Sequence, residues 1–390
     1  MKGKRGVAFL LCILSIFLLT TGCWDRKELD QVAIAAAIGI DKGADQKIQL
    51  TVQIIKPGAL KSPSDGGSSG TEKGVWIIKS SGDTVFEAVK NFREKSGRQL
   101  FWPHTKVIVI GEKIAKEGIL PAIDWFLRDP DMRLRTYVLV TQGEASEIIN
   151  GDSGLEKIPA SHLERMIKDY DILSKSVATN LMDITNMLLS HPSHAVIGRV
   201  GKSKSVQGEE EVFLREAGVF RKDKLLGWLN PLETRGYLWI QNKVKGGVII
   251  LPCTEEPNQL ISLEILKSKS KIIPKLENGT LKYTIEVDVT SNLGEQMGTE
   301  NLINPEMFTV LETEQGQAVE KEIVTLIQKA QEDYKLDILG LGEATLRELP
   351  QEWKKVKDQW EEKFPQAQIE VIVNSKLLHS GMVDSFKLPN

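Results

Sequence analysis

Cys23 is the residue whose surroundings point to a definite chemistry. Three basic residues, an apolar run at residues 7–19 and a short stretch of small residues precede it, which is the pattern of an export leader. The run is too short for a comfortable transmembrane helix. Thr20-Thr21-Gly22-Cys23 is similar to a bacterial lipobox, with Thr20 in place of the usual leucine. We therefore expect residues 1–22 to be a lipoprotein signal peptide and Cys23 to carry the lipid. The alternative is an ordinary signal peptide that contains a cysteine.

Two other stretches contain residue types that catalyse reactions or bind metals in other proteins. Gly151-Asp152-Ser153-Gly154 is similar to the nucleophile turn of serine proteases, but no His and Asp stand at readable partner positions, which favours a polar turn. His191 and His194 have Pro192 between them and no further His or Cys nearby, which disfavours zinc. The chain contains no Gly-x-Ser-x-Gly, His-Glu-x-x-His or Walker sequence. The sequence therefore predicts no catalytic residues, no cofactor and no metal site.

A third group of residues favours a structural contact. Asn230-Pro231-Leu232-Glu233 predicts the start of a helix, with Asn as N-cap and Pro at the first helical position. Arg235 and Trp239 are four residues apart and share a helix face, an arrangement that allows a cation–π contact. A glycine inside a helix, such as Gly236, costs about 1 kcal/mol relative to Ala. The close approach of another backbone would explain why a glycine stands at this position. We expect this helix to be a structural joint between domains, with a partner contact as the second interpretation.

The N-terminal part alternates strand and helix patterns. Residues 32–40 form an apolar run that suits a buried strand, although its alanines also allow a helix. Residues 48–54 alternate as in a half-buried strand. Residues 61–74 are rich in Ser, Gly and Pro and predict a mobile surface loop. Further strands are expected at 75–79, 106–110, 137–141 and 196–200, with helices from Thr84, near 114–126 and within 158–189. This alternation predicts a mixed sheet with helices against it.

The C-terminal part predicts an antiparallel sheet with helices on one face. Alternating strands at 261–265 and 281–289 flank Asn278-Gly279, a hairpin turn sequence. Apolar residues at helical spacing mark one long helix over 319–334 and another between Pro350 and Pro365, before a strand at 369–373. Trp353 and Trp360 of the second helix are expected in the core, with a sugar-binding surface as the minor alternative. Lys267, Lys269 and Lys271 continue the two-residue spacing of the buried positions Ile261 to Ile265, so an unbroken strand would point them to the same side. Either a bulge near Leu266 changes their side, or the strand extends beyond the core and carries a basic row into solvent.

These patterns predict a multi-domain α+β protein with mixed and antiparallel sheets, each with helices packed against it. We expect an N-terminal domain at 23–200, a polar boundary loop at 201–208, a central region at 209–260 that acts as the joint, and a C-terminal α+β domain at 261–390. Within the central region, strands 212–220 and 225–229 are expected to pair across the turn 221–224.

Charge and cysteine content narrow the function classes. Without Lys2, Lys4 and Arg5 of the leader the formal net charge moves from -3 to -6, which does not suit a nucleic-acid binder. Of the three cysteines only Cys253 remains after Cys12 leaves and Cys23 is lipidated. The exported body is therefore expected to have no internal disulfide.

Four stretches together resemble the Ger(x)C family, the C-subunit lipoproteins of spore germinant receptors. They are residues 215–239, which read REAGVFRKDKLLGWLNPLETRGYLW; residues 22–29, GCWDRKEL; Arg128-Asp129 with Arg133; and residues 337–342, DILGLG, ahead of Trp353. The resemblance implies a non-catalytic subunit that joins two integral membrane proteins, the A and B subunits, in the spore inner membrane. It implies a body on the outer face and a role in germination in response to nutrients. The competing interpretations are a solute-binding lipoprotein that feeds a transporter and a lipid-anchored envelope hydrolase.

Overall fold

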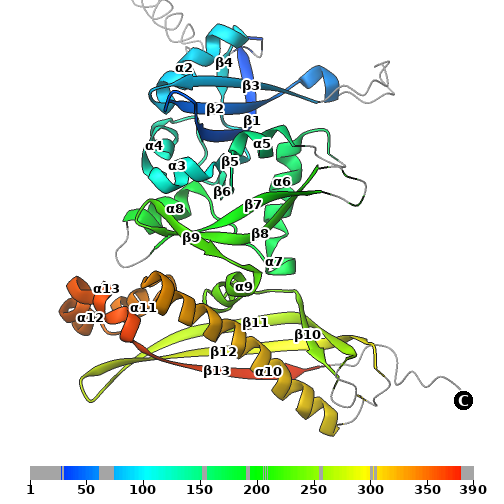
Figure 1. Cartoon of the computed structure of the whole chain (residues 1–390), viewed down its shortest axis with the longest axis vertical. Coiled ribbons are helices and arrows are strands. Elements are labelled where there is room, and N and C mark those ends of the chain that lie inside the picture. Colours follow the sequence, from blue (N-terminus) through cyan, green and yellow to red (C-terminus); the bar gives the residue numbers. More distant parts are fainter. Residues whose placement is uncertain are drawn as a thin grey trace, which may run out of the picture.

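The structure, a computed structural model, describes residues 28, 30–60, 74–151, 156–189, 194–204, 206, 208, 210–253, 258–298, 302 and 305–378. Its two sheets follow one another along the long axis of the molecule (Figure 1). We refer to residues 28–229 as the N-terminal half and to residues 230–378 as the C-terminal half. The predicted α+β class, with two sheets and helices packed against each, is confirmed.

The first sheet has nine strands and is mixed, as predicted. Strands β1, β5, β6 and β7 are parallel neighbours, while β2 and β3 on one side and β8 and β9 on the other are antiparallel. The short strand β4 pairs with the start of β1. The strands are β1 (Val32–Lys42), β2 (Ile48–Ile55), β3 (Val75–Gly82), β4 (Gln99–Phe101), β5 (Val107–Ile110), β6 (Tyr137–Val140), β7 (Val196–Lys204), β8 (Glu210–Arg221) and β9 (Lys224–Leu229).

Helices cover both faces of this sheet, so its central strands are buried on both sides. One face packs against α2 (Val85–Ser96), α3 (Glu112–Glu117), α4 (Leu120–Arg128) and α8 (Leu181–Leu189). The other packs against α5 (Ala145–Asn150) and α6 (Pro159–Lys168). The 3₁₀ helix η1 (Pro57–Leu60) follows β2, and the short helix α7 (Tyr170–Leu173) follows α6.

Strand β2 is more deeply buried than its alternating sequence predicts, so the half-buried prediction is wrong. Thr51 and Gln53 are both buried although they are polar. The Gln53 side chain donates to the carbonyl of Ile149 at 3.2 Å and accepts from the amide of Ala160 at 2.9 Å, at the first turn of α6. A buried polar side chain is tolerated when its donors and acceptors are satisfied. Here the glutamine links α5 and α6 to the sheet.

The predicted loop at 201–208 is partly wrong. Strand β7 continues to Lys204 and pairs antiparallel with β8, which begins at Glu210. By hydrogen bonding the first sheet therefore extends to the end of β9 at Leu229, which includes the predicted β8–β9 pair. The division into domains at 23–200, 209–260 and 261–390 stays a prediction. Apart from Gly74, the loop predicted at 61–74 lies outside the described residues.

The second sheet has the strand order β10-β11-β12-β13. Asn278 and Gly279 have φ values of 51° and 79° at the predicted hairpin between β11 and β12. The register shifts between Ile265 and Lys267, which is the predicted bulge, and the lysines beyond it are exposed. The last pair, β12–β13, is parallel, because helices α10 to α13 carry the chain back across the sheet before β13 begins. The strands are β10 (Val248–Pro252), β11 (Leu260–Glu277), β12 (Thr280–Gln296) and β13 (Gln368–Leu377).

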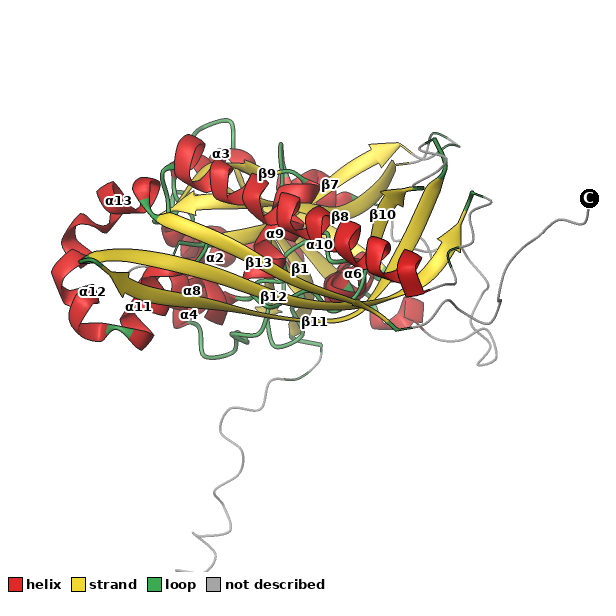
Figure 2. Ribbon diagram, turned by 90° about the horizontal axis from the view of Figure 1, so that it is seen from below, coloured by secondary structure: helices red, strands yellow, loops and turns green. Residues whose placement is uncertain are grey.

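Helices cover one face of the second sheet, and α10 crosses it beside β13 (Figure 2). The predicted stripe, which runs over α10 and η3, is confirmed, since Val319, Ile323, Ile327 and Ala330 are buried. These helices are α9 (Pro231–Ile240), α10 (Pro305–Gln328), the π-helix η3 (Lys329–Tyr334), α11 (Leu341–Glu348), α12 (Pro350–Val356), the 3₁₀ helix η4 (Lys357–Gln359), α13 (Trp360–Lys363) and the 3₁₀ helix η5 (Phe364–Gln366).

The single helix predicted between Pro350 and Pro365 is wrong, because α12, η4, α13 and η5 are four short pieces. Seven residues of continuous α-helix rise by about 10.5 Å. The break at η4 instead brings the rings of Trp353 and Trp360 edge to face, with centroids 5.5 Å apart. Both indoles are buried in the core, as predicted.

Candidate functional site

Helix α9 lies between the two sheets and begins at a complete capping box. The Asn230 side chain accepts from the amide of Glu233 at 2.9 Å, and the Glu233 carboxylate accepts from the amide of Asn230 at 2.8 Å. Pro231 occupies the first helical position, where a missing N–H costs nothing. Eight of the ten helical residues are buried. The predicted helix start is confirmed, and the helix has neighbours on both sheets.

Arg235 and Trp239 meet at one carboxylate. Arg235 Nε donates to Glu322 Oε2 at 2.8 Å and its Nη2 donates to Glu322 Oε1, while Trp239 Nε1 donates to Glu322 Oε2 at 2.9 Å. A further Arg235 nitrogen, Nη1, donates to the carbonyl of Val248 in β10 at 2.9 Å. The shared acceptor takes the place of the cation–π contact that the spacing of Arg235 and Trp239 allows, because a buried guanidinium gains more from a bidentate carboxylate.

Glu322 was missed by sequence reasoning. It belongs to α10 and is buried there although its chain neighbours Glu320 and Lys321 are exposed. One signal was available: Glu322 lies three residues after Val319 and four before Leu326, which places it on the apolar side of the helix. An acidic residue inside an apolar stripe predicts a buried partner.

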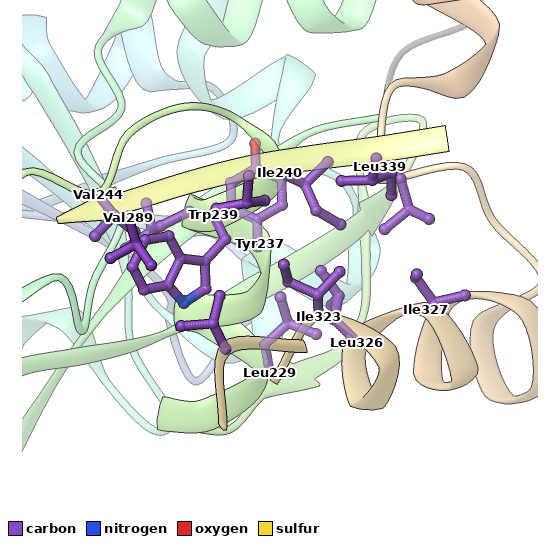
Figure 3. Packing of buried hydrophobic residues seen from close by; sticks show 14 of the residues in the cluster. Leu229, Tyr237, Trp239, Ile240, Val244, Val289, Ile323, Leu326, Ile327 and Leu339 are labelled. Atoms are coloured by element: carbon purple, nitrogen blue, oxygen red, sulfur yellow. The ribbon is translucent and has the colours of Figure 1, made fainter. Parts of the chain in front are cut away.

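Gly236 marks the closest approach of α9 to α10. A Cβ built on Gly236 would lie 2.5 Å from the carbonyl oxygen of Glu322 and 3.1 Å from Cβ of Leu326. No side chain fits at such a distance, so the expected close backbone approach is confirmed. Figure 3 shows the hydrophobic cluster that contains Tyr237 and Trp239 of α9 together with Ile323 and Leu326 of α10.

Tyr334, at the end of the π-helix η3, makes a connection between the two halves. Its hydroxyl donates to the carbonyl of Trp228 in β9 at 2.8 Å, and Arg221 Nη2 donates to the carbonyl of Tyr334 at 2.9 Å. A Cβ on Gly227 would lie 2.6 Å from the Tyr334 hydroxyl. Gly227 therefore gives the tyrosine access to β9. The stripe over α10 and η3 predicted that the Tyr334 side chain packs against other residues. It did not predict that the contact is with β9.

Asp337 organises the turn between η3 and α11. Its carboxylate accepts from the amides of Leu339, Gly340, Leu341 and Gly342 at 2.7–3.2 Å and from Trp360 Nε1 at 2.9 Å. Burial raises the pKa of Asp337, and the N–H donors act in the opposite direction. Nearby, burial raises the pKa of Tyr283 to about 12, and its hydroxyl is 2.9 Å from Thr345 Oγ1. These contacts fix Trp360 in the core.

The carboxyl ends of the parallel strands, where α/β sheets commonly bind ligands, are closed by a side chain of the protein. Asp41 at the end of β1 accepts from the amides of Ala145 and Ser146 at 2.6 and 2.8 Å, at the first turn of α5. Burial is the main cause that raises the pKa of Asp41. A Cβ on the neighbouring Gly111 would lie 2.2 Å from Asp41 Oδ1. The carboxylate thus occupies the position at which an anionic ligand would meet these amides.

The other chemistry-bearing residues are not brought together. Within the described ranges no group of three or more His, Cys, Asp or Glu side chains could hold a metal ion. Cys253 is buried and forms no disulfide within the described residues. Ser153 and His191 lie outside the described residues, and so does Cys23, so the lipid site stays a prediction. Among the described helices, none is both long and apolar enough to cross a bilayer.

Two family models match the chain in sequence order. One, described as the spore germination protein N-terminal domain, matches residues 25–202. The other, described as spore germination B3/GerAC-like, C-terminal, matches residues 215–381. The matched segments therefore lie on either side of the β7–β8 connection, and the second segment contains both α9 and α10.

Curated relatives match over nearly their whole length. Spore germination protein KC of Bacillus subtilis (strain 168) is 28% identical over 396 residues, covering 97% of each chain. Spore germination protein B3 of the same organism is 27% identical over 373 residues, covering 94% of this chain and 96% of the relative. The crystal structure of the GerBC protein matches with a TM-score of 0.57 at 23% identity, over 91% of this chain and 100% of that chain. That likeness shows the fold.

Proposed function

Because the chain belongs to the GerAC-like family of spore germination proteins, we propose that it is a lipid-anchored, non-catalytic subunit of a germinant receptor. In this proposal Cys23 carries the lipid and the body lies on the outer face of the spore inner membrane. The chain joins two integral membrane subunits, A and B, and serves as scaffold or sensor when nutrients start germination.

The observation that carries the proposal is the full-length correspondence with spore germination proteins. Both family models match, in order, and the relatives are covered from end to end rather than over one domain. A shared single domain would support a shared fold only, since one fold serves many functions. Correspondence of the whole chain supports a shared role.

The joint around α9 suits a scaffold. Arg235, Trp239 and Gly236 bind α9 to α10 within the C-terminal half, and across the halves the Tyr334 hydroxyl of η3 donates to the carbonyl of Trp228 in β9. A buried ion pair costs desolvation, which good geometry and further hydrogen bonds offset. Here the Tyr334 contact fixes η3 against β9, and the contacts of α9, the helix that directly follows β9, fix it against α10. This arrangement supports a body that holds one shape while it contacts two partners.

The solute-binding alternative receives less support from the geometry. A solute-binding lipoprotein of the doubly wound type would offer a ligand site at the carboxyl ends of its parallel strands. In this chain Asp41 occupies that edge. The receptor-subunit proposal needs no ligand at that place.

The test replaces Cys23 by Ala in the chromosomal gene, with Cys12→Ala as the matched control in the leader. The Ala variant at position 23 should leave the spore membrane fraction, and the optical density of its spores should fall more slowly on exposure to amino acids, sugars or nucleosides. Cys12→Ala spores should behave as wild type. Retention of the Cys23→Ala chain in membranes that lack the A and B subunits, or an unchanged germination rate, would contradict the proposal. An acyl anchor should dominate membrane affinity, since each buried CH₂ contributes about 0.8 kcal/mol.

A further inference from the structure

A groove of about 560 Å³ lies where α7 meets the strands β10 and β11. Figure 1 shows α7 at the lower end of the N-terminal half, facing the second sheet. Large aliphatic side chains line the groove from both sides: Ile172 and Leu173 of α7 are 60% and 61% exposed, and Val248 and Leu266 are 46% and 41% exposed. Four exposed aliphatic side chains in one concavity are unusual on a solvated surface, and contiguous patches of this kind mark contact sites.

The walls of the groove are held in place by contacts between the halves. The Ser174 hydroxyl donates to the carbonyl of Gly246 at 2.8 Å, and Lys245 forms an ion pair with Asp171 at 2.9 Å. A Cβ on Gly246 would lie 2.9 Å from the carbonyl oxygen of Ile172, so the backbone before β10 is in contact with the backbone of α7. The groove is therefore preformed, and a partner would not have to order it, which lowers the cost of binding.

Its rim carries one charge of each sign. Lys175, just after α7, and Glu264 of β11 are exposed, and neither forms an ion pair with another residue in the described part of the chain. Asp171 is already neutralised by Lys245. Apolar walls with a charged rim are the usual anatomy of a protein–protein contact. A cation on one wall and an anion on the other also set the direction in which a charged segment can enter.

We propose that this groove binds a segment of a partner protein that places two or three large aliphatic side chains between α7 and β10. An acidic residue of the segment faces Lys175 and a basic residue faces Glu264. The proposal rests on the proposed function, in that the partner is one of the membrane subunits of the receptor. A bilayer fits less well, because membrane-docking surfaces are protruding, aromatic-rich and basic, whereas this site is concave, aliphatic and of mixed charge.

The test places a photoreactive phenylalanine at Ile172 in the full-length lipidated chain in spores, and at Leu276 as control. Leu276 lies at the tip of the β11–β12 hairpin and is 46% exposed. Irradiation should link position 172, and not position 276, to a membrane subunit, at a peptide with aliphatic residues between an acidic and a basic one. A link to a second copy of the chain, to another part of the same chain or to lipid would overturn the proposal.

Substitutions give the second arm. Leu173→Asp should weaken copurification of the membrane subunit about thirtyfold, the size expected for a contact hot spot of about 2 kcal/mol, while Leu276→Asp should not. Lys175→Glu should weaken copurification, and exchange of the partner's acidic residue for Lys should restore it; Lys321→Glu on α10 is the control. If the wild-type chain copurifies with both membrane subunits and Leu173→Asp does too, the groove proposal fails and the proposed function stands. If the wild-type chain copurifies with neither, the proposed function itself fails.

A vesicle experiment distinguishes binding of the groove to a partner protein from binding of the groove to lipid. Binding of the Cys23→Ala chain, which lacks the lipid anchor, to vesicles of anionic and neutral lipids should be the same with and without Leu173→Asp. Loss of vesicle binding in the variant would assign the groove to the membrane and overturn the proposal.

Discussion

Arg235 and Glu322, which are 87 residues apart in the chain, form a buried ion pair between α9 and α10. The carboxylate accepts from two nitrogens of the guanidinium and from Trp239 Nε1, and the guanidinium donates in addition to the carbonyl of Val248. One acidic side chain thus links the central helix to the long helix, and its arginine partner reaches the edge of the second sheet.

Glu322→Gln should destabilise the protein by about 3–5 kcal/mol, because it leaves Arg235 buried without a counter-ion. The free energy of unfolding from denaturant titration measures this loss. Glu320→Gln, on the exposed side of the same helix, should change it by less than about 0.5 kcal/mol. Arg235→Met combined with Glu322→Leu should recover much of the loss, since apolar replacement of a buried pair is often neutral. Equal effects of Glu322→Gln and Glu320→Gln would show that the pair does not stabilise the joint.

Gly236→Ala and Gly316→Ala should change stability in opposite directions. Both glycines are inside helices, where Ala is favoured by about 1 kcal/mol. At Gly316 the new Cβ would have its nearest neighbours at 3.8 Å, so the helix should gain stability. At Gly236 the Cβ would lie 2.5 Å from the Glu322 carbonyl, and overpacking of this kind costs about 1–3 kcal/mol. Thermal unfolding of the two variants measures the difference, and stabilisation by both would contradict close packing at α9.

A larger residue at the same position should change the shape of the molecule. Gly236→Val should force α9 away from α10 and broaden the range of shapes seen by small-angle scattering, and assembly of the receptor should fail. Scattering curves that coincide with those of the wild type would place the joint elsewhere.

Tyr334 and Gly227 should be energetically coupled. Gly227→Ala removes the space for the tyrosine hydroxyl, which lies 2.8 Å from the Trp228 carbonyl in the wild type. Tyr334→Ala should make the Gly227→Ala change nearly neutral, so a double-mutant cycle should give a coupling of about 0.5–3 kcal/mol. Additive effects would mean that η3 and β9 do not depend on one another.

Asp337→Asn should cost at least about 3 kcal/mol. In Asn an NH₂ group replaces one carboxylate oxygen, and this group donates hydrogen bonds instead of accepting them. The N–H groups that pointed at that oxygen therefore lose their acceptor. The near-UV circular dichroism should also change, because Trp360 loses its hydrogen bond. Asp358→Asn, at an exposed position of η4, should leave both measurements as they are.

Features set by neighbours in the chain were predictable from sequence. The capping box of α9 joins Asn230 to Glu233, and the hairpin turn is set by Asn278 and Gly279, so each depends on residues no more than a few positions apart. Gly236 was predicted as a close approach because a helical glycine needs a reason. The bulge after Ile265 was one of two ways to keep the lysine row out of the core, and the structure contains it.

Features that depend on residues far away in the chain were not predictable from sequence. Gln53 looks like the polar side of a half-exposed strand, and only α5 and α6, about a hundred residues later, bury it. Strand β13 has the alternation of any edge strand, and its parallel direction follows from the helices that precede it. Glu322 stands among charged residues, so its burial depends on where α9 packs.

Affinity purification of the full-length lipidated chain from detergent-solubilised spore inner membrane shows directly whether this chain is a receptor subunit. We expect two integral membrane proteins, the A and B subunits, to copurify with the wild-type chain and to be lost together with Cys23→Ala. Recovery of the wild-type chain alone, or with the permease of a solute transporter, would contradict it.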